Sequence, residues 1–153
     1  MSESTGFMKG FEMMKKLLVG GEMIDSTLAN IGLLVLRVFM GLSMALAHGL
    51  GKVPPSERFI EGTAKLGFPL PEFFAWAAGF SECFGGLFLA VGLFTRPSAF
   101  FLCSTMFVAA FIRHGADPFS GKEKALLFFF ISLAFLLIGA GKYGVDTWLR
   151  SRK

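Results

Sequence analysis

The sequence has few charged residues and almost no tyrosine. Only 17% of its 153 residues are Asp, Glu, Lys or Arg, whereas a soluble domain usually carries about 25%. It contains 20 Phe but a single Tyr, and Phe lacks the polar group that suits an aromatic ring to a wet surface. These shortages exclude an ordinary soluble domain and predict that lipid surrounds much of the chain.

Sequence motifs of cofactor and enzyme chemistry are also missing. The two cysteines, Cys83 and Cys103, lie inside apolar segments and form no CxxC pair, so we interpret them as small buried hydrophobic residues. The sequence contains no phosphate loop, nucleophile elbow, HExxH motif or dinucleotide fingerprint. A self-sufficient enzyme of the soluble type is therefore not expected, and the question of enzymatic activity stays open.

The net charge of +4 does not indicate a nucleic-acid partner. The basic residues lie at the ends of apolar segments rather than along one polar face, and there they can contact lipid headgroups. The expected partner is the lipid bilayer and not a nucleic acid. The sequence leaves open whether the chain is a subunit of a redox complex and whether it forms a homo-oligomer.

Long apolar runs dominate what the sequence does contain. They lie at about 28–51, 72–94, 97–113 and 124–141. These lengths are near the lower end of the roughly 17–25 residues that cross a bilayer as a helix. A helix of a soluble bundle would need a polar stripe toward water, which the last two runs lack. We predict an all-α integral membrane four-helix bundle over residues 28–149, with residues 52–71 as its longest loop.

Residues 1–27 differ in composition from the rest. Phe7, Phe11 and Leu18 recur at helical spacing among lysines, a pattern that predicts an amphipathic helix lying in the membrane interface. A flexible leader is the alternative. Residues 150–153 form a basic tail.

The distribution of Lys and Arg predicts the orientation in the membrane. Four crossings place both termini and the turn after the second span on one side, which carries eight basic residues against six on the other. Because basic residues mark the cytoplasmic side, we predict a multi-pass protein of the cell (inner) membrane with both termini in the cytoplasm. On that side Arg96, Lys142 and Asp146 are interpreted as structural or topological anchors, and we expect Arg96 to contact Asp146.

Two ionisable residues lie deep within the apolar runs, where charge is costly and usually functional. Arg37 lies about 14 Å, and Glu82 about 18 Å, from the same side of the bundle at 1.5 Å per residue. We therefore predict that Arg37 and Glu82 form an intramembrane polar pair. A buried pair can also do no more than lock two helices together, and the sequence leaves this structural interpretation open.

Small residues flank both charges. The faces consist of Gly41, Ala45 and Gly49 after Arg37, and of Gly79, Cys83, Gly86 and Ala90 around Glu82. Such faces let helix backbones approach closely in lipid. We therefore assign Gly41 and Gly86 to helix packing.

A second polar group is expected at the opposite end of the bundle. His48 and Lys52 end the first run, His114 follows the third, and Glu123 precedes the fourth. Two imidazoles and a carboxylate can bind a ligand or relay a proton, although interfacial His residues are common for packing reasons alone. Their spacing matches no local metal motif, so no metal is expected.

Several segments together resemble the DoxX family. Its opening is matched by Leu36-Arg37, Gly41, His48-Gly49 and Lys52. Its central E…GG…GLxTR stretch is matched by Glu82, Gly85-Gly86 and Gly92-Leu93-Phe94-Thr95-Arg96. Its final helix is matched by Glu123 and Gly139-Ala140-Gly141-Lys142-Tyr143-Gly144-Val145-Asp146. The resemblance covers about residues 31–149.

This resemblance implies a four-span bacterial or archaeal membrane protein. The family name is shared with the small subunit of a thiosulfate:quinone oxidoreductase, and its members are associated with membrane redox complexes. We accordingly expect a subunit or accessory of a membrane redox system, in which a quinone or small sulfur species approaches Arg37 and Glu82. The rival hypothesis is a non-enzymatic membrane protein, either a small transporter or an assembly factor.

Overall fold

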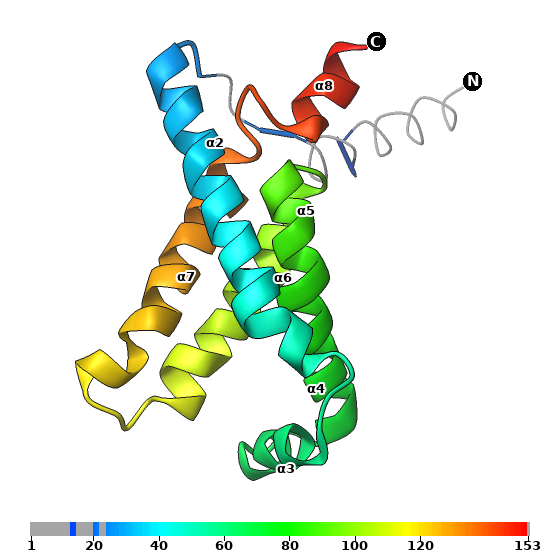
Figure 1. Cartoon of the computed structure of the whole chain (residues 1–153), viewed down its shortest axis with the longest axis vertical. Coiled ribbons are helices and arrows are strands. Elements are labelled where there is room, and N and C mark those ends of the chain that lie inside the picture. Colours follow the sequence, from blue (N-terminus) through cyan, green and yellow to red (C-terminus); the bar gives the residue numbers. More distant parts are fainter. Residues whose placement is uncertain (1–12, 15–19, 22–23, 153) are drawn as a thin grey trace, which may run out of the picture.

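The computed structural model describes residues 13–14, 20–21 and 24–152, and all its regular structure is helical (Figure 1). No strand occurs within these residues, so the all-α prediction is confirmed for the part described. Most of the predicted amphipathic segment, residues 1–27, lies outside the described residues.

The first long helix runs without a break from Thr27 to Lys52. It consists of α2 (Thr27–Leu42), the π-helical η1 (Ser43–Gly49) and the 3₁₀ turn η2 (Leu50–Lys52). At its start the Ser26 hydroxyl accepts a hydrogen bond from the backbone N–H of Ala29, which satisfies one of the unpaired donors of a helix N-terminus. It ends before Pro54, which cannot continue a helix.

The second and third long helices are joined by a tight turn. The second comprises α4 (Pro71–Phe80), the π-helical η3 (Ser81–Gly85) and α5 (Gly86–Val91). The third comprises α6 (Thr95–Phe107) and the π-helical η4 (Val108–Arg113). Gly92 ends the second helix with a φ of 73°, a left-handed conformation that glycine adopts without steric cost. Pro97 lies in the first turn of α6, as its sequence position predicts.

The last long helix, α7 (Phe119–Ile138), packs along α6. It begins five residues before the predicted boundary at 124 and stops at Gly139, whose φ is 84°. The short helix α8 (Val145–Ser151) follows, and only its last two residues belong to the predicted basic tail at 150–153.

The predicted loop over residues 52–71 contains a helix, so that prediction is wrong. Helix α3 (Glu57–Lys65) is capped by Ser56, whose hydroxyl accepts from the backbone N–H of Phe59. It ends beside Gly67, which has a φ of 85°. Both signals are present in the sequence, but nine residues between prolines and glycines are too short for a reliable apolar period.

Among the residues that the structure describes, three helical runs are long and apolar enough to cross a membrane: Thr27–Lys52, Pro71–Val91 and Thr95–Arg113. Large apolar side chains stay exposed on their outer faces, among them Phe39, Phe101 and Val91. So much exposed apolar surface is unfavourable in water, whereas it is not unfavourable in lipid. The protein is therefore a membrane protein. α7 is equally apolar beyond residue 124 but carries Lys122, Glu123 and Lys124 near its start.

Glycines bring the first two long helices into backbone contact. A Cβ at Gly41 would lie 2.5 Å from the carbonyl oxygen of Gly86, and one at Gly79 would lie 2.6 Å from that of Lys52. At Gly49 a Cβ would collide with the backbone of Cys83. These contacts fix an antiparallel register in which Gly41 is level with Ala90, Ala45 with Gly86, and Gly49 with Cys83.

The interior is filled by flexible and small apolar side chains. The buried cluster consists of Met40, Met44, Leu89, Ala99, Leu102, Met106 and Phe135. Methionine fills irregular gaps between helices.

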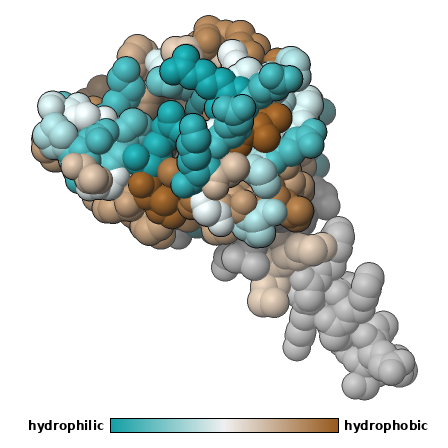
Figure 2. Space-filling model, turned by 90° about the horizontal axis from the view of Figure 1, so that it is seen from below, coloured by the Kyte–Doolittle hydropathy of each residue, from teal (hydrophilic) through white to brown (hydrophobic). Residues whose placement is uncertain are grey.

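At the end of the molecule that carries α3, hydrophilic residues cover much of the surface (Figure 2).

We expect Gly49→Ala to destabilise the protein by about 1–3 kcal/mol, because the added methyl forces the two backbones apart. Unfolding in mild detergent, followed by helical circular dichroism, measures the change. Gly51→Ala is the matched control, since a Cβ there meets nothing within 4 Å. Equal stability of the two variants would contradict the close contact.

Candidate functional site

Glu82 and Lys52 form a partly buried ion pair between the first two long helices. Glu82 lies on η3 with 2% of its side chain exposed, and Lys52, at the end of the first helix, is 31% exposed. The Lys52 Nζ donates to the Glu82 Oε1 at 2.7 Å and also contacts Oε2. Two charges at this depth stabilise each other, because an isolated charge in an apolar medium is strongly unfavourable.

This arrangement corrects the predicted Arg37–Glu82 pair. The Arg37 guanidinium donates to the carbonyl oxygens of Ala140, at 3.0 Å, and Tyr143, at 3.2 Å. A Cβ at Gly92 would overlap the Arg37 guanidinium, so Arg37 is level with the end of the second helix. Because Glu82 is level with Gly49, the two residues are separated by about 18 Å along the bundle at 1.5 Å per residue.

Asp146 occupies the same end as Arg37. Its carboxylate accepts from the backbone N–H groups of Phe94 and Thr95, both at 2.8 Å. It thereby caps the start of α6, where negative charge is favourable. The predicted contact with Arg96 is wrong, because Arg96 donates instead to the carbonyl oxygen of Leu137 at 2.8 Å.

Asn30 completes this polar group, which we call the terminal-end cluster (Asn30, Arg37 and Asp146). Its side chain donates to Ile24 and Ser26 carbonyl oxygens and accepts from the backbone N–H of Lys142. All three members are almost fully buried, and their partners are mostly backbone groups. Lys142 itself has an exposed side chain. The cluster ties the segment after α7 to α2 and to the start of α6.

Of the four residues predicted as a ligand site or proton relay, only Lys52 joins Glu82. The His48 ring packs edge-on against Phe128, with centroids 5.6 Å apart. The His114 Nδ1 lies 2.7 Å from the Asp117 carboxylate, and Glu123 is exposed on α7. Within the part of the chain that the structure describes, no group of three His, Cys, Asp or Glu residues could hold a metal.

Beside the ion pair lies an apolar cavity of about 530 Å³, bounded by α3, by α4 with η3, and by α6 with η4. Six phenylalanines line it: Phe59, Phe68, Phe73, Phe74, Phe100 and Phe101. We call it the aromatic cavity. Lys52 reaches its wall and also lies over the Phe59 ring, 5.3 Å from the centroid.

Two hydroxyl groups add a second polar element to this wall. Thr105 donates to the Ser81 hydroxyl at 3.2 Å, and both residues line the cavity. The sequence offered a signal for this cavity in its excess of Phe. It did not show which phenylalanines would converge, because that depends on α3 lying across the ends of the helices.

Each of the three membrane-spanning helices is π-helical near this site. η1 precedes Lys52, η3 contains Glu82, and η4 lines the cavity. π-helical turns are uncommon and occur frequently at functional sites, because they displace side chains from regular positions. Chemically, the ammonium can donate a hydrogen bond and the carboxylate can hold a proton beside a ring bound in the cavity.

We expect Lys52→Met alone to destabilise the protein by about 3 kcal/mol, because it leaves the Glu82 charge buried without a partner. Combining Lys52→Met with Glu82→Leu should recover most of this loss. Unfolding free energies of the four proteins in the cycle, measured in detergent, give the coupling.

Arg37→Leu combined with Glu82→Leu is the matched control. Because these residues are about 18 Å apart along the bundle, their effects should add to within about 0.5 kcal/mol. Additive effects in the Lys52–Glu82 cycle would contradict the ion pair.

Comparison with known proteins identifies relatives of this chain. The family model named DoxX matches residues 32–115. A protein of Haemophilus influenzae described as uncharacterized is 32% identical over 117 residues, which cover 67% of this chain and 80% of that protein. No solved structure matches. Both Lys52 and Glu82 lie inside the matched segment, and by this match the chain belongs to the DoxX family.

Proposed function

We propose that this protein is a subunit or accessory of a membrane redox system and that it binds a quinone in the aromatic cavity. The observation that carries the proposal is that Lys52 lines that cavity while it is paired with the buried Glu82, which does not itself line the cavity. A hydrogen-bonded pair of opposite charges next to an apolar space can bind a neutral polar ring. Each charge keeps its partner when such a ligand binds.

The size and lining of the cavity support a quinone. Its volume of about 530 Å³ lies within the range of roughly 300–1,000 Å³ that is usual for small-molecule sites. Phenylalanines surround it, so a planar apolar ring gains contacts by stacking and edge-on packing. The polar groups on the wall are few, which fits a ligand with only two carbonyl oxygens.

The proposed chemistry is proton transfer coupled to quinone reduction. Lys52 donates a hydrogen bond to one quinone oxygen, and Glu82 exchanges protons with the quinone through Lys52 as the quinone takes up two electrons and two protons to become a quinol. The electrons come from a partner subunit, because the sequence has no CxxC pair or recognisable haem or flavin attachment.

The topology belongs to the same proposal. α7 serves as the fourth span of a bundle in the cell (inner) membrane, with residues 1–27 in the interface and both termini in the cytoplasm. The Lys52–Glu82 pair then lies toward the outer side, because Lys52 ends a span that starts on the side of the termini. Basic residues at the termini support this orientation.

We expect Ala78→Phe to lower quinone retention about tenfold, since a phenyl ring on this half-buried wall residue fills part of the cavity. The measurement is extraction of quinone that copurifies, and rebinding of short-chain ubiquinone and menaquinone in detergent. Ala47→Phe is the control, because Ala47 lines an outer groove of the first helix. Equal loss in both variants would contradict binding in the cavity.

We expect Glu82→Gln to bind quinone but to slow quinone-linked turnover by about 100-fold, because an amide cannot replace a carboxylate in proton transfer. Turnover is followed in membranes containing the native partner subunits. Glu123→Gln, which changes an exposed carboxylate, should have little effect.

If the wild-type protein neither binds a quinone nor supports turnover with any partner, the redox assignment must be abandoned. Solute flux in liposomes that is abolished by Glu82→Gln would then point to transport. Capture of a partner chain without any cofactor would point to assembly.

A further inference from the structure

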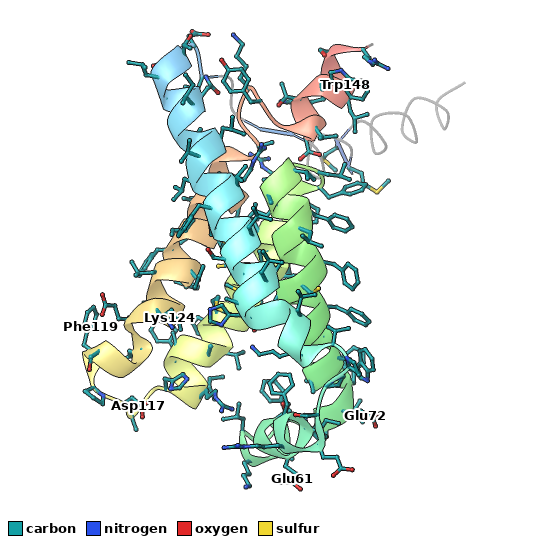
Figure 3. All side chains as sticks on the ribbon, viewed as in Figure 1. Glu61, Glu72, Asp117, Phe119, Lys124 and Trp148 are labelled. Carbon is teal, nitrogen blue, oxygen red and sulfur yellow. The ribbon has the colours of Figure 1, made fainter. Side chains whose placement is uncertain are left out.

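A second, polar hollow adjoins the aromatic cavity on the side of α3. It has a volume of about 730 Å³ and lies between α3 and the connection that follows η4. Its charged residues are Lys52, Arg58, Lys65, Arg113, Glu61 and Asp117. We call it the basic hollow. Glu61 and Asp117 lie at the same end of the molecule, on α3 and on the α6–α7 connection (Figure 3).

The charges of the basic hollow are not balanced. It has four cationic side chains and two acidic ones, and Asp117 is engaged by His114 at 2.7 Å. Lys52 is paired with Glu82, which is not one of the two acidic residues of the hollow. Within residues 24–152, Arg58, Lys65 and Arg113 form no ion pair. An added anion would therefore meet uncompensated positive charge.

Arg113 lies at one wall of the hollow, next to α3. A Cβ at Gly62 of α3 would lie 3.4 Å from the Arg113 Nη1, so the guanidinium lies directly against the helix. A guanidinium presents several N–H donors in one plane and suits the oxygens of a phosphate-type group. Arg113 is exposed, so an anion can reach its guanidinium without displacing other side chains.

The depth of the hollow matches the headgroup region of a bilayer. Lys52 and Arg113 are the last residues of two membrane-spanning helices, and hydrophilic surface covers this end of the molecule (Figure 2). The hollow and the aromatic cavity share Lys52, Phe59, Leu66 and Arg113 on their walls. A ligand can therefore place a charged group in the hollow and an apolar part toward lipid or the cavity.

We propose that the basic hollow binds one phosphate-type oxoanion, with Arg113 as its main ligand and Arg58 and Lys65 as supporting charges. The anion is carried by the headgroup of an anionic phospholipid or is free in solution. This site adjoins the quinone site proposed above and shares Lys52 and Arg113 with it, but its argument does not depend on a quinone being bound.

The test uses the full chain, purified in a zwitterionic detergent. One arm titrates phosphatidylglycerol and counts retained lipid by native mass spectrometry, with phosphatidylcholine as the neutral comparison. The other arm titrates inorganic phosphate by calorimetry. We expect one anion per chain in at least one arm, and the arm that responds identifies the source.

Arg113→Gln should weaken this binding about tenfold, the effect of losing a charged hydrogen bond of about 1.4 kcal/mol or more. Arg113→Lys, which keeps the charge, should retain part of the affinity and shows that a loss is not simply misfolding. Lys142→Gln removes an exposed cation at the opposite end and should leave binding unchanged.

The proposal is overturned if neither arm gives stoichiometric binding, or if Lys142→Gln weakens binding as much as Arg113→Gln. Quinone retention is measured on the same samples. A variant that loses the anion but retains quinone shows that the two ligands bind independently. A variant that loses quinone but retains the anion shows the same.

Discussion

The backbone contact between the first two long helices determines where each charge of this protein finds a partner. Gly41 lies against Gly86, and Gly49 lies against Cys83. Because no side chain separates the helices at these points, their register cannot slide without opening the interface. That register places Lys52 beside Glu82 and leaves Arg37 at the far end. The pairing of charge is thus a consequence of helix packing rather than its cause.

The two polar groups that result are chemically different. The terminal-end cluster uses backbone carbonyl and N–H groups as partners for Arg37, Asn30 and Asp146, so it closes off that end of the bundle. The other end pairs two side chains of opposite charge, Lys52 and Glu82, and Lys52 also lines both the aromatic cavity and the basic hollow. We therefore interpret the first group as structural and propose ligand binding only at the second.

Helix α3 gives the second end its shape. It is short and amphipathic, and it lies across the ends of the membrane-spanning helices (Figure 1). Phe59 on its inner face contributes to the aromatic cavity, whereas Arg58 and Lys65 contribute to the basic hollow. The π-helical segments η1, η3 and η4 lie in the same half of the bundle. Membership of the DoxX family includes Lys52, α3 and Glu82 in the matched segment, so this site belongs to the shared part of the chain.

The sequence by itself determined that the chain is helical and lies in a membrane, because apolar runs with few charges allow no other solvent. It located the ends of the helices only approximately: the second and fourth runs extend to 94 and 141, whereas the helices end at Val91 and Ile138, before Gly92 and Gly139, which have positive φ. Only the tertiary structure decided the partners of Arg37 and Glu82. The predicted depths of Arg37 and Glu82 were counted from the ends of their spans, which assumes that the start of the first helix is level with the end of the second. In the structure, α2 starts about ten residues, or about 15 Å, beyond the end of α5. The aromatic cavity likewise required tertiary structure, since its phenylalanines come from helices that meet only when α3 folds back across the bundle.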